Sequence, residues 1–471
     1  MANIADLDAL KLSKAIHDRS LSCREVMQAY LDQIEKHNPK INAIISMRSY
    51  DDLISQAQSY DNIKPKGWLH GIPIAIKDLS ESKNLITTWG SSIFKNHIST
   101  IDSIVSERIK EAGAIIIGKT NTPEFGLGSH TYNPVNGITR NPYNLDKTAG
   151  GSSGGTAAAL AANLLPVADG SDMMGSLRNP AAFNNVYGFR PTWGLVPNDA
   201  EGDTFMQTLA TSGPMGRNPM DMAHLLETMV GPNPLLPVNQ TPDESYTSDL
   251  DKTVSKKRIG WIGDWNGYYQ YETGITDLCK NALTQYSEMG VEVEKFSPDF
   301  DPKLLWNSWL TLRSWSVSNG MRNLYNDKIK RSLLKPEIIY EIESGLALSA
   351  TQVYEASVIR SNWFQYLTKV FNKFDALALP SAQVFPFNVE TNWPNQINNV
   401  EMLTYHQWME VVIPVSLVGL PAINIPCGFS EQNLPMGLQL FGAQGNDKLM
   451  LQFAQNYHLV TDWPNQKKPV L

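Results

Sequence analysis

A glycine- and serine-rich stretch that runs directly into an alanine-rich stretch constrains this chain more than any other feature. Residues 148–156 hold four glycines and two serines, which favour turns over helix. Residues 157–162 are alanine and leucine only, which are strong helix formers. The sequence therefore predicts a loop that enters a helix N-terminus, where free N–H groups favour negative charge. Ser152 or Ser153 would lie beside such a site; the alternative is a simple helix cap.

Composition excludes several classes of partner. The 471 residues carry a formal net charge of -8, which argues against binding to nucleic acid or an anionic membrane. The glycine-rich stretch has neither the P-loop lysine nor the G-x-G-x-x-G spacing of nucleotide sites. The three cysteines lie far apart, which indicates a reducing compartment, no disulfide framework and no metal site. With no signal-peptide pattern and no long apolar run, we expect a cytoplasmic protein. We also expect that the protein needs no cofactor.

Strands and helices alternate in the pattern of an α/β fold. Ile72, Ile74 and Ile76 alternate with other residues and predict a buried strand that ends on Lys77. A helix over 103–112 is followed by a strand over 114–121, the repeat typical of a sheet with crossover helices. Further strands are predicted at 164–168, 258–263, 291–296, 375–380, 422–426 and 437–441. Further helices are predicted at 181–185, 221–230, 275–289 and 448–457. Two more helices are predicted within 4–37, and residues 37–39 should end the second of them.

A lysine is the best candidate for a catalytic base. None of the eight histidines lies in a serine-hydrolase pattern. The free pKa of lysine is about 10.4, so a lysine base must lose about three units. Burial and nearby helix N-termini both lower a lysine pKa. Lys77, at the end of an apolar strand, has the right surroundings; the alternative is a structural pair with Asp78.

Three stretches in this order resemble the amidase signature family. They are Gly-Ile-Pro-Ile-Ala-Ile-Lys-Asp at 71–78, Gly-Gly-Ser-Ser-Gly-Gly at 150–155 and Gly-Ser-Asp-Met-Met-Gly-Ser-Leu-Arg at 170–178. Shorter matches follow at 118–124, 140–142, 188–191, 212–215 and 419–423. The resemblance spans most of the chain and is densest over 65–220. It implies a single large α/β/α domain whose central mixed β-sheet is covered by helices on both faces.

The resemblance also implies an organisation along the chain. Residues 1–64 would be an N-terminal helical segment packed on the core, and 65–230 the catalytic core. The stretch 231–257, rich in proline and small polar residues, would be a linker. Residues 258–471 would complete the same α/β domain and carry a helical insertion at about 303–375.

The family uses a triad of two serines and a lysine. Carried over by position, Ser176 is the nucleophile, Ser152 the bridging serine after a cis peptide bond, and Lys77 the base. Ser153 is the nearest rival to Ser152.

The loop before the nucleophile departs from the family's pattern. The family usually has Thr-Gly-Gly-Ser, whereas this chain has Met173-Met174-Gly175-Ser176. The resemblance implies that the backbone N–H groups of these four residues hold the oxyanion, and that Asp172 and Arg178, together with Ser153, brace the site. A methionine at 174 would be strained if that position required a positive φ; otherwise its side chain narrows the acyl site.

The function implied is hydrolysis of the carbon–nitrogen bond of a small-molecule amide or carbamate through an acyl-enzyme. Aryl or alkyl amides, carbamates and oligoamides are all candidates, and the protein is expected to be a monomer or homodimer. One alternative is the catalytic subunit of a tRNA-dependent amidotransferase, which works with a partner protein. Against it, the residues after Gly194 lack the Arg-x-Ser-x-Tyr-Gly sequence of that subunit. A catalytically inactive binding protein is disfavoured because the triad residues are intact.

Overall fold

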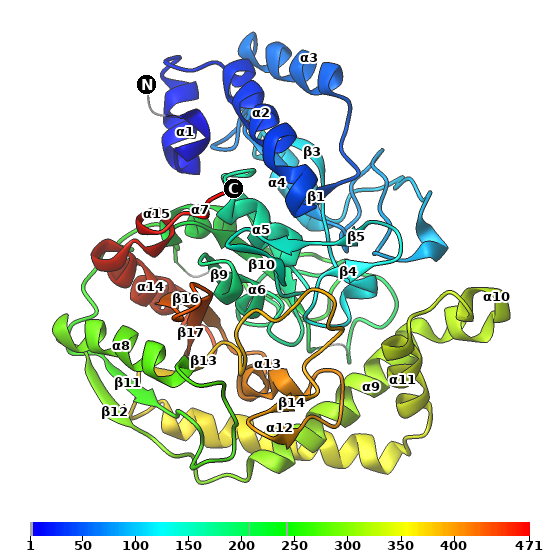
Figure 1. Ribbon diagram of the computed structural model, residues 1–471, viewed down its shortest axis with the longest axis vertical. Helices are drawn as coiled ribbons and strands as arrows, with labels where there is room; N and C mark the ends of the chain where they lie inside the picture. The colour runs from blue at the N-terminus through cyan, green and yellow to red at the C-terminus, as the bar shows by residue number, and fades with distance from the viewer. Residues whose placement is uncertain (1–2, 207, 242–243) are drawn as a thin grey trace.

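A computed structural model describes residues 3–206, 208–241 and 244–471 of the protein (Figure 1). Its main sheet has eight strands. The strand order is β12-β11-β13-β17-β16-β9-β10-β8. β11 runs parallel to β12 and β13, and the other neighbours are antiparallel, so the sheet is mixed, as predicted. The bounds are β8 (Val167–Asp172), β9 (Tyr187–Arg190), β10 (Thr211–Gly216), β11 (Arg258–Trp261), β12 (Glu292–Lys295), β13 (Ala376–Pro380), β16 (Ala422–Phe429) and β17 (Pro435–Phe441).

The strand that ends on Lys77 belongs to a second, smaller sheet. β2 (Pro73–Lys77) pairs in parallel with β3 (Ile115–Thr120), and β1 (Ile44–Ile45) covers the other side of β3. The backbone N–H of Lys77 donates to Asp169 Oδ1 of β8 at 3.0 Å. A side chain of the main sheet thus takes a donor at the end of β2, and this bond joins the two sheets at Lys77.

Helices cover both faces of the main sheet. α6 packs on β9, β16 and β17, while α8 and α14 also pack on β16. The helix bounds are α1 (Ala9–His17), α2 (Cys23–Ile41), α3 (Tyr50–Asp61), α4 (Ile104–Glu111), α5 (Gly154–Ala161), α6 (Arg178–Phe183), α7 (Pro219–Met229), α8 (Ile275–Glu288), α9 (Pro302–Asn326), α10 (Lys328–Arg331), α11 (Pro336–Leu346), α12 (Ala350–Val370), α13 (Ile413–Ser416), α14 (Asp447–Thr461) and α15 (Trp463–Gln466). In the described ranges, no helix is long and apolar enough to cross a membrane.

The N-terminal helices are present, but one predicted boundary is wrong. Ser22 and Glu25 form the capping box at the start of α2. The helix does not stop at 37–39, because Pro39 lies in its last turn and the helix continues to Ile41. Asn42 then takes the left-handed conformation and caps the end through its N–H bond to the Asn38 carbonyl. Pro39 has no N–H to donate to the carbonyl four residues back, and the helix extends only two residues beyond it.

The predicted helical insertion is made of α9 to α12, which lie at the opposite end of Figure 1 from α1 to α3. α9 packs on both α11 and α12. Trp309 and Trp363 on these helices are fully buried, so these rings belong to the core. In the described part of 231–257 there is no helix or strand, yet Tyr246 and Leu250 are buried. Residues 242–243 lie outside the described ranges, and the proposed division into segments stays a prediction.

Short hairpins complete the structure around the loops that follow β3 and β13. They are β4 (Tyr132–Asn133) with β5 (Gly137–Ile138), β6 (Arg140–Asn141) with β7 (Asn144–Thr148), and β14 (Gln396–Ile397) with β15 (Val400–Glu401).

Candidate active site

The glycine- and serine-rich stretch is a buried loop that enters α5, as its composition predicts. Ser153 is the N-cap residue and α5 begins at Gly154. The peptide bond between Gly151 and Ser152 is cis, as the family resemblance implies. Close approach explains one of the glycines, because a Cβ on Gly155 would lie 2.3 Å from the backbone nitrogen of Asn121. The loop is therefore held against neighbouring backbone with no room for larger residues there.

Lys77 points its amine into this loop. Every residue of β2 is buried, and Lys77 is 1% exposed. Its Nζ donates to Ser152 Oγ and Ser153 Oγ, both at 2.8 Å. Burial lowers the pKa of Lys77 to about 7, and the nearby charges of Asp169 and Asp172 only partly oppose that shift. Because its pKa is close to neutral, a substantial fraction of Lys77 is an uncharged amine that can accept a proton near pH 7.

A third hydroxyl completes the surroundings of this amine. Ser171 Oγ accepts from Lys77 Nζ at 3.0 Å, and the Ser171 carbonyl oxygen lies 3.4 Å away. Ser171 and Asp169 were not predicted as site residues from the sequence. Ser171 lies within the third stretch that resembles the family, at 170–178, and Asp169 immediately precedes it, so their place in the sequence was the available signal.

Ser176 lies close to the two serines through its backbone. The N–H of Ser153 donates to the Ser176 carbonyl at 3.3 Å, and Ser176 is 6% exposed. In the described ranges the Ser176 hydroxyl makes no hydrogen bond, and none joins the Ser152 and Ser176 side chains. The geometry therefore brings Lys77 and Ser152 together directly, while a proton path from Ser176 to Ser152 stays a prediction.

The loop at 173–176 accommodates its two methionines without backbone strain. Gly175 has a φ of +78°, whereas Met174 is not among the residues with positive φ. Met174 is 5% exposed and belongs to the main apolar core. The condition under which a methionine at 174 would be strained is therefore not met.

The Gly175 N–H is not free to hold an oxyanion, which corrects the four-donor expectation. It donates to Asp172 Oδ1 at 2.8 Å. Of the remaining expected donors, the N–H groups of Met173, Met174 and Ser176 have no acceptor among the residues that the structure describes. These three are the donors left for a negatively charged oxygen.

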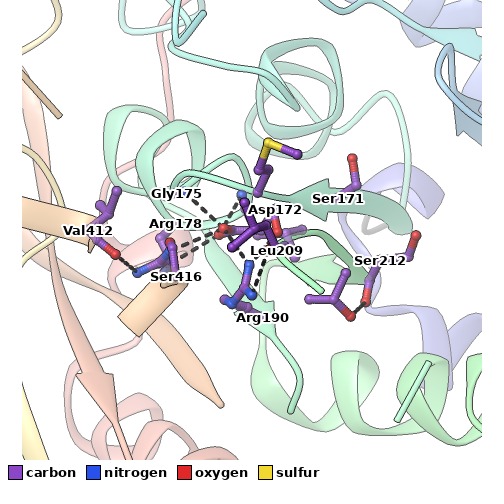
Figure 2. Close-up of polar contacts among 12 residues, drawn as sticks. Ser171, Asp172, Gly175, Arg178, Arg190, Leu209, Ser212, Val412 and Ser416 are labelled. Atoms are coloured by element: carbon purple, nitrogen blue, oxygen red, sulfur yellow. Dashed lines mark hydrogen bonds and ion pairs between the residues drawn. The ribbon is translucent and has the colours of Figure 1, made fainter. Parts of the chain in front are cut away.

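Asp172 is the centre of a buried polar network (Figure 2). Arg178 Nε lies 3.0 Å from Oδ2 and Nη2 lies 3.1 Å from Oδ1, and both side chains are fully buried. The Leu177 N–H also donates to Oδ2, at 3.2 Å. Burial alone would raise the pKa of Asp172, but the charges of Arg178 and Arg190 hold it well below its usual range. The carboxylate therefore stays ionised and fixes the loop that carries Ser176.

Arg190 is a second cation on Asp172 and was not predicted as a site residue. Its Nη1 lies 3.1 Å from Asp172 Oδ1. Arg190 lies in the short match to the family at 188–191. No pattern in the sequence indicated that it pairs with Asp172, 18 residues away.

Across the described residues, no group of three histidine, cysteine or acidic side chains is placed to hold a metal ion. The groups that this site offers for chemistry are the serine hydroxyls, the Lys77 amine and the backbone donors.

Comparison with known proteins identifies the family. The Amidase family model matches residues 25–451. The chain belongs to this family. It is 31% identical to a glutamyl-tRNA(Gln) amidotransferase subunit of Alkaliphilus metalliredigens, in an alignment that covers 99% of both chains. It is 29% identical to an acylamidase of Rhodococcus erythropolis, over 99% of this chain and 98% of the relative. A bacterial aryl acylamidase of the amidase signature family superimposes with a TM-score of 0.91 at 27% identity, over 98% of this chain and 97% of the other.

Membership of the amidase family supports hydrolysis of a carbon–nitrogen bond of an amide. The relatives include both acylamidases and amidotransferase subunits, so family membership does not choose between these substrates.

Proposed function

We propose that this amidase hydrolyses a small-molecule amide or carbamate through Lys77, Ser152 and Ser176, with a covalent acyl-enzyme. One observation carries the proposal: the buried Lys77, whose pKa is about 7, lies 2.8 Å from Ser152 Oγ. A lysine that paired with carboxylates for structural reasons would stay charged. For Lys77, burial lowers the pKa by more than the charges of Asp169 and Asp172 raise it. The reaction belongs to hydrolysis of linear amides outside peptide bonds.

The proposed reaction starts from neutral Lys77. Its lone pair takes the Ser152 proton as Ser152 takes the proton of Ser176, and the Ser176 oxygen forms a bond to the amide carbonyl carbon. The tetrahedral oxyanion is held by the N–H groups of the 173–176 loop that remain free. The carbon–nitrogen bond then breaks, and the leaving amine takes the proton back through Ser152. Water, activated by the same pair, hydrolyses the ester to Ser176.

The network on Asp172 supports this chemistry indirectly. Asp172 holds the Gly175 and Leu177 N–H groups, the residues on either side of Ser176. Arg178 and Arg190 keep the carboxylate ionised and in place. We assign Asp172 and Arg178 as positioning residues that keep the nucleophile loop in one conformation.

The second candidate function is an amidotransferase component, favoured by the 31% identity to the glutamyl-tRNA(Gln) amidotransferase protein of Alkaliphilus metalliredigens. The sequence after Gly194, Leu195-Val-Pro-Asn-Asp, argues against it. The two functions differ in a simple measurement. A free-standing amidase is active as the purified chain, alone or as a homodimer, while an amidotransferase component requires a partner protein.

The proposed nucleophile is tested by labelling. A fluorophosphonate probe should label the wild-type protein at Ser176, and Ser176→Ala should abolish the label. Ser357→Ala, an exposed position on α12, is the matched control and should label normally. A panel of anilides, alkyl amides and carbamates then defines turnover by the purified chain. Wild-type protein that takes up no label and cleaves no amide would contradict the proposal.

A further inference from the structure

We propose that a cavity beside the candidate active site binds an aromatic ring of the amide substrate. The inference rests on the proposed function and narrows its substrate class. The cavity has a volume of about 470 Å³, which fits a ring with a short substituent. Its lining includes Tyr132, Lys335, Tyr340, Trp393, Leu403 and Tyr405.

One wall of the cavity is fastened to the loop of the proposed nucleophile. Arg313 Nη1 lies 3.3 Å from Met173 Sδ, at the start of the 173–176 loop. The same guanidinium donates through Nη2 to the Tyr405 hydroxyl at 2.8 Å. Arg313 thus spans from the loop of the proposed nucleophile to a ring that lines the cavity.

A second residue of the lining is bonded to the loop that passes near Ser152. A Cβ built on Gly126 would lie 3.4 Å from Ser152 Oγ, so this backbone passes close to the bridging serine. The carbonyl of the next residue, Leu127, accepts a hydrogen bond from Lys335 Nζ. Lys335 and Tyr405 line the same cavity. Tyr405 is linked to the 173–176 loop through Arg313, and Lys335 is bonded to Leu127, which follows Gly126 near Ser152. These links place the cavity next to the loops that carry Ser152 and Ser176.

The lining favours an aromatic ring over a charged or purely aliphatic group. Tyr340 and Tyr405 meet edge-on, with centroids 6.3 Å apart and an interplanar angle of 85°, an arrangement that a further ring can extend. Leu403 is 76% exposed and Tyr340 43% exposed at the mouth, so apolar surface is left without a covering side chain. The cation in the lining, Lys335, is balanced by Glu337, so the cavity offers no net charge to select an ion.

The cavity is also rigid on its inner side. The Tyr405 hydroxyl donates to Glu341 Oε1 at 2.7 Å, and Arg313 Nε lies 2.6 Å from the same oxygen. Burial would raise the pKa of Glu341, yet the Arg313 charge lowers it, so the carboxylate stays ionised as an acceptor. The Tyr405 ring is held by two such bonds and is already ordered before a substrate binds. Binding of a substrate ring therefore does not require the loss of Tyr405 side-chain entropy.

Equilibrium binding tests the cavity without requiring turnover. Full-length Ser176→Ala protein is titrated calorimetrically with acetanilide, benzamide and N-hexylacetamide, which place a ring on the amine side, a ring on the acyl side, or no ring. We expect at least one aromatic amide to bind about tenfold more tightly than N-hexylacetamide. Tyr340→Ala and Trp393→Ala should each remove most of that preference, while Tyr354→Ala, an exposed tyrosine on α12, should leave it intact.

The outcomes separate this inference from the proposed function. Equal binding of all three amides, or an aromatic preference that survives both Tyr340→Ala and Trp393→Ala, would overturn the cavity as the ring site. Methanesulfonyl fluoride, which has no ring, reports the nucleophile independently. If wild type fails to react with it while the aromatic preference and its loss are seen, the cavity stands and the proposed triad falls.

Discussion

Ser153 accepts a hydrogen bond from Lys77 at 2.8 Å, the same distance at which Ser152 does so. Distance therefore does not separate the bridging serine from its neighbour. Other contacts do. The Ser153 hydroxyl also lies 3.3 Å from both the N–H and the carbonyl of Ser171, and the Ser153 N–H is bonded to Ser176. Ser153 therefore holds the loop in place. Among the described residues, the Ser152 hydroxyl has a hydrogen bond to Lys77 alone.

Removing either hydroxyl should therefore have different effects. We expect Ser152→Ala to lower kcat/KM by about 10⁴-fold or more, as for a member of a catalytic unit, with KM little changed. Ser153→Ala should cost less activity and show its effect mainly as lower stability, because it leaves Ser171 with an unpaired N–H. Steady-state kinetics and denaturant unfolding on both variants check this. A larger loss of kcat/KM in Ser153→Ala would exchange the two roles.

Activity should rise with pH around neutrality. Burial lowers the pKa of Lys77 to about 7, so the amine is protonated below that pH and neutral above it. Only the neutral amine can accept the Ser152 proton, so kcat/KM should fall about tenfold for each pH unit below 7 and level off above it. The measurement is a pH–rate profile of kcat/KM on one amide substrate.

Two variants keep this profile interpretable. Lys77→Ala should lose nearly all activity, and its residual rate should lack the inflection near pH 7. Lys83→Ala, an exposed lysine, should keep the wild-type profile. An inflection that persists in Lys77→Ala would assign the titration to another group.

Much of the site could be predicted because its signals are local. Alternating isoleucines placed Lys77 at the end of a buried strand, and alanines placed the helix after the serines. The contacts of the site that were not predicted join distant parts of the chain. The Asp172–Arg190 pair spans 18 residues, and the Arg313–Met173 contact spans 140. Helix α3 was missed, and Pro39 was misread because a proline in a last turn has the same sequence signal as one that ends a helix.

The buried Asp172–Arg178 pair should be strongly coupled. Replacing Arg178 by methionine leaves Arg190 as the remaining ion-pair partner of Asp172 among the described residues, and breaking a buried pair costs about 3–5 kcal/mol. We expect Arg178→Met to lower the free energy of unfolding by an amount in that range, measured by denaturant titration. Lys14→Met, which breaks the exposed Lys14–Asp18 pair, should change it by less than about 1 kcal/mol. Similar losses in the two variants would show that Arg190 alone satisfies Asp172.

Gly175 should tolerate no side chain, for two separable reasons. Its φ is +78°, where a Cβ costs about 1–2 kcal/mol. A Cβ there would also lie 2.9 Å from Val412 Cγ1, so the loop or Val412 must move. Gly267 has a φ of +85° and nothing within 4 Å of a built Cβ, so Gly267→Ala measures the backbone cost alone. We expect Gly175→Ala to lower the free energy of unfolding more than Gly267→Ala does, because only the alanine at 175 would also contact Val412.

Gly175→Ala should also lower kcat, because the shift displaces the N–H bond to Asp172 and with it Ser176. Denaturant unfolding and kcat on both variants test this, and equal losses with full activity would show that the loop position does not govern the nucleophile.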